Sequence, residues 1–137
     1  TMQSKALLTR DDVARIVAAA RGEATKNGWA VAIAVVDDGG HPLALERLDG
    51  CAPIGAYICT EKARTSALGR RESKGYEDMI NGGRNAFLSA PVIAGMLEGG
   101  VPIVVDGQVV GAIGVSGVKP DQDAAVARAG AAAVPTG

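Results

Sequence analysis

The sequence predicts an α+β fold in which an antiparallel sheet, built from two β-hairpins, is covered by helices. Two segments, residues 29–48 and residues 101–117, each have the pattern of strand, turn and strand. Helical sequence precedes each hairpin and also follows the second one. Strands joined by tight turns pair antiparallel, and helices are needed to bury the sheet. The whole chain, 1–137, is therefore expected to form a single domain.

The second hairpin, residues 101–117, carries the stronger signal. An apolar, β-branched run precedes Asp106-Gly107, a dipeptide that accepts positive φ at both centres of a type I′ turn. The returning strand holds Gly111, Gly114 and Gly117. Glycine inside a strand costs stability and marks a close approach of another backbone or a ligand. Two interpretations follow, namely tight packing of a helix on the sheet or a ligand lying against the backbone.

The first helix is expected to begin after Thr9, whose side chain can accept hydrogen bonds from the early backbone N–H groups. Asp11 and Asp12 favour the positive end of the helix. Asn27-Gly28 ends the helix with a left-handed residue. The buried face is predicted from apolar residues at helical spacing, which are Val13, Ile16, Val17, Ala20 and Ala24.

The first hairpin follows that helix. Residues 29–37 are too apolar to be exposed on both faces, so a central strand is expected there. Asp38-Gly39-Gly40 turns the chain, and residues 41–48 return with partial alternation of apolar and polar side chains. The turn ends at His41, the single histidine of the sequence.

The second half of the chain begins with a helix from Pro53 to Leu68, closed by Gly69. Its buried face is expected to contain Ile54, Tyr57 or Ile58, Thr65 and Leu68. Four further elements are predicted: a weaker helix within 70–83, an irregular stretch over 84–90, a short helix from Pro91 to Glu98, and an Ala-rich helix that starts at Pro120.

Composition narrows the function classes. A net charge of −1, no basic block and only one Trp, two Tyr and one Phe argue against a nucleic-acid partner. The apolar runs are far shorter than the roughly 20 residues of a membrane span, so no membrane partner is expected. Cys51 and Cys59 are too few for a disulfide framework, which favours buried thiols and a cytoplasmic location.

The chain resembles the GlcG/HbpS family, also described as haem-degrading or PduO C-terminal-like domains, in three blocks that occur in the family's order. The blocks are AIAVVDDGGHPLALERLDG, EKARTSALGR and GGVPIVVDGQVVGAIGVSG. The resemblance implies a profilin-like α+β fold and homo-oligomers. It also implies haem binding or, for some members, lyase chemistry on hydroxylaminobenzoate in nitroaromatic catabolism.

Haem binding requires an axial ligand, most often His, Cys, Met or Tyr. The first helix, where some haem-binding relatives carry a histidine, has none between Thr9 and Gly28. This absence counts against haem binding. In the haem alternative His41 is the candidate ligand, and the competing interpretation is a plain turn residue. No CxxC, HExxH or acidic-loop pattern predicts a metal site.

The segment 70–100 resembles the lyase-like branch of the family. The leading hypothesis is therefore a cofactor-independent lyase, or a binder, of a small aromatic carboxylate such as 4-hydroxylaminobenzoate, with release of ammonia. Arginine can hold a carboxylate bidentately, and a Glu–Tyr pair can supply an acid and a base. The predicted substrate-binding residues are Tyr57, Lys62, Arg64, Arg71 and Arg84. The predicted catalytic residues are Glu61, Glu72 and Tyr76.

This site is expected between segment 70–100 and the helix that holds Glu61 and Thr65, near a subunit boundary. A homo-oligomer is expected because Ala- and Gly-rich helices and apolar hairpins leave surface that one small domain would not expose. Two alternatives stay open, haem binding and a non-catalytic oligomeric carrier of a small molecule. The same charged residues also fit ordinary solvated or paired surface positions.

Overall fold

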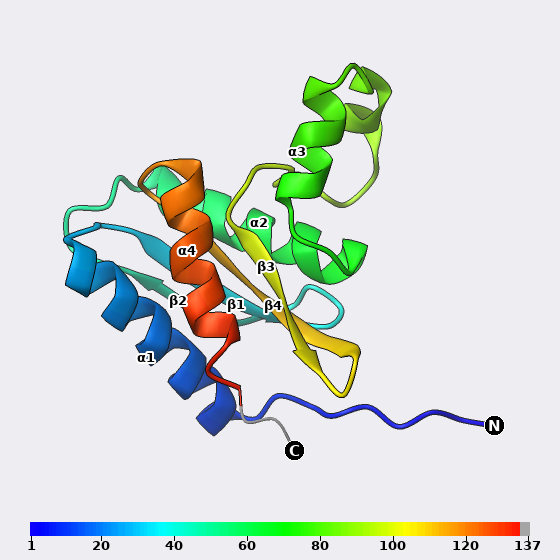
Figure 1. The fold of residues 1–137 in the computed structure, drawn as a ribbon, viewed down its shortest axis with the longest axis horizontal. Coiled ribbons are helices and arrows are strands. Elements are labelled where there is room, and N and C mark those ends of the chain that lie inside the picture. Colours follow the sequence, from blue (N-terminus) through cyan, green and yellow to red (C-terminus); the bar gives the residue numbers. More distant parts are fainter. Residues whose placement is uncertain (135–137) are drawn as a thin grey trace.

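A four-stranded antiparallel sheet lies between two helical layers in the computed structural model, which describes residues 1–134 (Figure 1). The strand order is β2-β1-β4-β3. The elements in chain order are α1 (Arg10–Asn27), β1 (Ala32–Asp37), β2 (Pro42–Arg47), α2 (Ile54–Gly69), α3 (Lys74–Asn81), the 3-10 helix η1 (Asn85–Ser89), β3 (Gly100–Val105), β4 (Gln108–Ser116) and α4 (Pro120–Ala131). The predicted α+β class, with two hairpins covered by helices, is confirmed.

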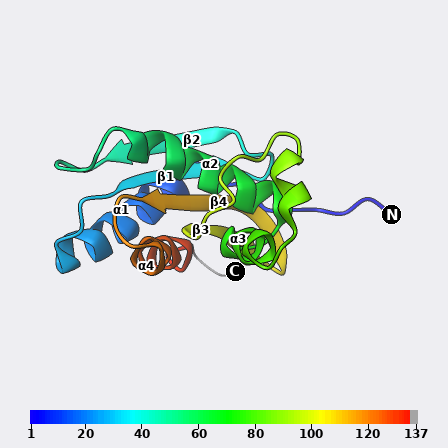
Figure 2. The ribbon, with the colours of Figure 1, turned by 90° about the horizontal axis from the view of Figure 1, so that it is seen from above.

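The two faces of the sheet carry different cores. Figure 2 shows α1 and α4 on one face and α2 on the other. The α1/α4 side is filled by branched side chains such as Ile16, Ile33 and Ile113, all fully buried. The α2 side is filled by small residues, mainly alanines with Cys51 and Cys59. Both cysteines are free thiols, and burial raises the pKa of Cys59 to about 11, so they are inert packing groups.

The predicted start and end of the first helix are confirmed. Thr9 and Asp12 form a reciprocal capping box at its start, and Gly28 closes it with φ 71°. The predicted buried face is also correct, because its five residues are the buried ones of α1. The second hairpin turns at Asp106 and Gly107 with φ of 51° and 75°, the two positive values of a type I′ turn.

The buried face of α2 was predicted correctly at Thr65 and incorrectly at its large apolar residues. Ile54, Tyr57 and Leu68 are exposed, whereas the buried residues are small or polar: Gly55, Cys59, Lys62, Ala63, Thr65, Ser66 and Ala67. The cause is the close approach of β4, where a Cβ on Gly114 would lie 2.0 Å from the carbonyl oxygen of Cys59. Gly114 therefore serves tight packing of a helix on the sheet, one of the two interpretations offered above.

Residues 74–94, here called the arm, rise away from the end of the sheet (Figure 1). The arm contains α3 and η1, and neither helix has a buried residue. The helix predicted from Pro91 to Glu98 is wrong, because Val92 adopts φ 73° and the backbone there is irregular. Gly95 then returns the chain to α2, with its N–H donating to Thr65 Oγ1 at 3.1 Å.

None of the helices in the part of the chain that the structure describes combines the length and the apolar character needed to cross a bilayer.

Candidate functional site

The turn between β1 and β2 holds a carboxylate–imidazole pair. The Nδ1 atom of His41 lies 3.0 Å and 3.1 Å from the two carboxylate oxygens of Asp37. The backbone N–H groups of Gly39 and His41 also donate to Asp37, at 2.9 Å and 3.0 Å. Partial burial alone would raise the pKa of Asp37, but these hydrogen bonds outweigh it and lower that pKa. Asp37 is therefore ionised at neutral pH, and it orients the ring of His41.

The other ring nitrogen of His41 faces outward, because the side chain is 78% exposed and the structure gives Nε2 no partner among residues 1–134. An ionised acceptor at Nδ1 favours the tautomer with its proton on that nitrogen. The lone pair of Nε2 is then available to an external Lewis acid.

Three cationic side chains surround this turn. Lys5 pairs with Asp38, and the guanidinium of Arg70 donates to the carbonyl of the same residue. Arg64 packs on the turn from α2, where a Cβ on Gly40 would lie 2.9 Å from its Cγ atom. Two of these cations are already paired, Lys5 with Asp38 and Arg64 with Glu61, so the turn carries no excess of positive charge.

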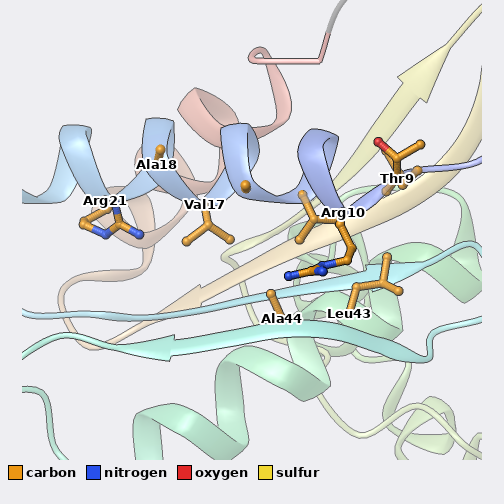
Figure 3. Close-up of a pocket in the computed structure, with 10 residues that line it drawn as sticks. Thr9, Arg10, Val17, Ala18, Arg21, Leu43 and Ala44 are labelled. Carbon is orange, nitrogen blue, oxygen red and sulfur yellow. The ribbon is translucent and has the colours of Figure 1, made fainter.

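A groove of about 600 Å³ runs between α1 and β2 (Figure 3). Its walls are mostly apolar, and the lining residues are Leu8, Thr9, Arg10, Val13, Ala14, Val17, Ala18, Arg21, Leu43 and Ala44. Arg21 is held by Glu46 at 2.6 Å, whereas Arg10 has no ion-pair partner within residues 1–134. Figure 3 shows the Arg10 side chain extending over the groove toward Leu43.

This groove ends near the histidine turn, because Leu43 follows His41 by two residues of extended chain. The groove has no imidazole, thiol, thioether or phenol among its lining residues. The groove lining itself therefore supplies no haem ligand of these kinds.

A second groove, of about 500 Å³, lies between β2 and α2. Its lining residues are Leu45, Arg47, Pro53, Ala56, Tyr57, Thr60 and Glu61. Two predicted site residues, Tyr57 and Glu61, meet here, and Arg64 reaches the same place through its ion pair with Glu61. Arg47 has no ion-pair partner in the described part of the chain, so its guanidinium is available to a carboxylate.

Lys62 does not line either groove. Its side chain is 5% exposed, and Nζ donates to the Val115 carbonyl at 2.9 Å and to Asp123 at 3.2 Å. Asp123 also accepts from the N–H of Val118, and burial raises its pKa despite these partners. The predicted role of Lys62 in substrate binding has no support from this position, because the ammonium is enclosed in the core.

The remaining predicted residues lie apart from both grooves. Arg71 covers the ring of Tyr76 at 4.7 Å, and that ring stacks on Phe87 with centroids 5.1 Å apart. Glu72 points to the opposite layer, where Arg128 of α4 donates to it at 2.8 Å. Arg84 is exposed on the arm. One chain therefore does not bring the predicted catalytic residues together.

Sequence reasoning passed over one group that the structure makes prominent. Asp37 stands four residues before His41, a spacing that a tight turn closes into a hydrogen-bonded pair. Arg47 ends β2, directly opposite the first turns of α2. Within residues 1–134 no cluster of three or more His, Cys, Asp or Glu side chains suits a metal ion.

Comparison with known proteins agrees with this architecture. A family model described as "Haem degrading protein HbpS-like" matches residues 8–132. Protein GlcG of Escherichia coli (strain K12) is 62% identical over 115 residues, which cover 84% of this chain and 85% of that protein.

Two solved structures superpose on nearly the whole chain. A double mutant of Streptomyces reticuli HbpS is 30% identical with a TM-score of 0.88, covering 98% of this chain and 91% of that one. The PduOC:Heme complex has a TM-score of 0.84, covering 96% and 98%, and at 23% identity it shows the shared fold alone. With the family model spanning all elements from α1 to α4, the chain belongs to the HbpS-like family of haem-degrading proteins.

Proposed function

We propose that the protein binds haem, with Nε2 of His41 as the axial ligand of the iron. The observation that carries this proposal is the Asp37–His41 pair, in which a carboxylate takes Nδ1 and leaves Nε2 open. Metal-ligating histidines almost always donate their other ring N–H to a carboxylate, a carbonyl or water.

The surroundings of His41 fit the other parts of a haem molecule. The α1/β2 groove offers apolar surface beside the turn, and its volume of about 600 Å³ is that of a ligand site. Arg10, which has no ion-pair partner within residues 1–134, is suited to a propionate. When bound, haem supplies an iron centre for redox or gas-ligand chemistry. The chain itself contributes orientation of the imidazole, charge for the carboxylates and apolar cover.

Family membership supports the same ligand, since the matching family is described as haem-degrading. The chain lacks a histidine in α1, so a haem bound here needs its axial ligand from another element. His41 is the single imidazole in the sequence, which makes the proposal depend on one side chain.

A haemin titration followed by visible absorption tests this proposal. The wild-type protein should shift the Soret band with a one-to-one endpoint, and His41→Ala should lose that shift. Asp37→Asn should weaken the complex about ten- to a hundredfold, because it removes the partner of the ligand. Circular dichroism checks that both variants remain folded. A wild-type Soret band that persists in His41→Ala would show that the ligand is another residue.

A second candidate function is binding, and ammonia-releasing cleavage, of a small aromatic carboxylate in the α2/β2 groove. The observation in its favour is the convergence of Arg47, Tyr57 and Glu61 on one groove of about 500 Å³. Arg47 can hold the carboxylate, Tyr57 can stack on the ring, and Glu61 can act as acid or base. This assignment needs no cofactor.

Arg47→Ala should weaken the binding of 4-hydroxylaminobenzoate about ten- to a hundredfold, since a charge-assisted hydrogen bond contributes roughly 1.5–3 kcal/mol. Calorimetry measures the affinity, and an ammonia assay measures turnover by the same samples. Arg15→Ala is the matched control, because Arg15 lies exposed on α1 and far from this groove. Equal affinity in the Arg47 and Arg15 variants, or no ammonia from the wild type, counts against this second candidate.

A further inference from the structure

A separate pocket lies at the end of the sheet where β1 begins and β2 ends, opposite the His41 turn. Its volume is about 300 Å³, the lower limit of ordinary ligand pockets, so it has room for a small molecule. Figure 1 shows the end of α1 and the start of β1 at this end of the sheet. The lining residues are Arg21, Thr25, Gly28, Trp29, Ala30, Leu48 and Asp49.

Trp29 forms the aromatic wall of this pocket and is the single tryptophan of the sequence. Its backbone N–H donates to the Ala24 carbonyl at 2.9 Å, and its half-buried side chain packs against the core on the α1/α4 side. The indole is therefore held in place while part of it remains accessible. Of the aromatic side chains, tryptophan attracts a cation over its ring most strongly.

Two negative features lie beside the indole. Asp49 is exposed at the pocket, and its carboxylate makes no ion pair in the part of the chain that the structure describes. Helix α1 ends at Gly28, another lining residue, and the C-terminal end of a helix carries a partial negative charge. Both features favour a positively charged ligand.

The basic side chains of α1 near the pocket are already paired. Arg21 donates to both carboxylate oxygens of Glu46, at 2.6 Å and 2.8 Å. Lys26, in the last turn of α1, is paired within the same helix at 3.3 Å. Arg47, two residues before Asp49, lines the α2/β2 groove instead. The carboxylate of Asp49 therefore leaves the pocket with a net negative charge.

We propose that this pocket binds a small alkylammonium cation, whose charge lies over the indole of Trp29 with Asp49 as its counter-ion. Ala30 and Leu48 provide apolar surface for the carbon groups on the nitrogen. A methylated ammonium combines positive charge with apolar surface, so it suits this lining better than a bare metal ion, which needs several oxygen ligands. The proposal does not rest on haem binding, because His41 lies beyond the other end of β2.

Fluorescence titration with choline chloride tests the proposal on the full chain, because all tryptophan emission comes from Trp29. At constant ionic strength, choline should change the emission saturably with a Kd of about 1–10 mM, as expected for one cation–π contact and one exposed counter-ion. The uncharged isostere 3,3-dimethylbutan-1-ol should bind at least about tenfold more weakly, because it has the same shape without the charge. Equal affinity for the two compounds, or no saturable change up to about 50 mM choline, overturns the proposal.

Asp49→Asn should weaken choline binding about tenfold, because it removes the counter-ion, while the haemin titration stays as in the wild type. Asp106→Asn is the matched control. It removes a carboxylate from the exposed β3–β4 turn at the other end of the sheet, where asparagine also accepts a positive φ (Figure 1). This control should bind choline as the wild type does. Equal loss in both variants, or no loss in Asp49→Asn, contradicts the site.

Trp29→Leu tests the indole by a second readout, because this variant has no tryptophan emission. The wild type should broaden the N-methyl proton NMR signal of choline, and the variant should do so at least about tenfold less. Circular dichroism verifies the fold, and Trp29→Phe, whose ring attracts a cation more weakly, should fall between the two. A folded Trp29→Leu or Trp29→Phe protein that broadens the signal as the wild type does contradicts the contact with the indole.

Discussion

Replacing Lys62 with methionine should lower the free energy of unfolding by about 3–5 kcal/mol, the usual cost of removing one partner of a buried ion pair. Lys62 connects α2 to the Val115 carbonyl and to Asp123 in α4, through hydrogen bonds of 2.9 Å and 3.2 Å. Without the ammonium, Asp123 would be left in the core as an uncompensated charge. Urea denaturation followed by circular dichroism measures the change.

The matched control is Lys74→Met, which removes an exposed ion pair with Asp78 at 2.8 Å. That variant should change stability by no more than about 0.5 kcal/mol. Replacing both partners of the buried pair, as Lys62→Met with Asp123→Leu, should recover much of the loss, because no unpaired charge remains. A Lys62→Met protein within 1 kcal/mol of the wild type would mean that the pair does not hold the two helical layers together.

Gly114→Ala is expected to cost about 3 kcal/mol or more, at the upper end of the range for overpacked cores. The added Cβ would lie 2.0 Å from the Cys59 carbonyl oxygen and 2.5 Å from the Ala63 nitrogen. Both atoms belong to the backbone of α2, so the helix as a whole would have to move off the sheet. A thermal melt should show the loss directly.

Gly22→Ala is the matched control, because it replaces a glycine by alanine at a position where the added methyl group causes no steric clash. A Cβ on Gly22 would meet nothing within 4 Å, and the residue lies inside α1. Alanine there should stabilise the protein by about 0.5–1 kcal/mol. If Gly114→Ala melts at the wild-type temperature, β4 and α2 do not pack as closely as described.

Much of the fold could be predicted because its signals are local. The capping box at Thr9, the Asp106-Gly107 turn and the apolar spacing of α1 each depend on residues close in sequence. Hairpins then fix which strands pair. The order β2-β1-β4-β3 adds one long-range pairing, of β1 with β4, which places the two most buried strands at the centre.

The face of α2 could not be predicted from apolar spacing alone. Where β4 has Gly114, the helix comes so close that alanines and Lys62 occupy the interior and Tyr57 is left outside. Periodicity ranks residues by apolar character, whereas this interface selects them by size. The same limit explains Pro91, whose segment has helical composition but follows an irregular path on the arm.

The candidate site was harder to predict because charged residues that are close together in the sequence need not have side chains that lie close together in the structure. Glu72 and Tyr76 are four residues apart, yet Glu72 turns to Arg128 on α4 and Tyr76 turns to Phe87 on the arm. His41 was identified as a candidate ligand from its residue type. Its partner Asp37 becomes evident once the turn is seen to close between them.

Imidazole rescue tests the central claim that His41 ligates haem. His41→Gly mixed with haemin should lack the wild-type Soret band, and added imidazole should restore it by occupying the vacated ligand position. The same additive should leave the spectrum of the wild-type complex unchanged at those concentrations. The account is contradicted if His41→Gly keeps the wild-type spectrum without imidazole, or if imidazole fails to restore it in a folded variant.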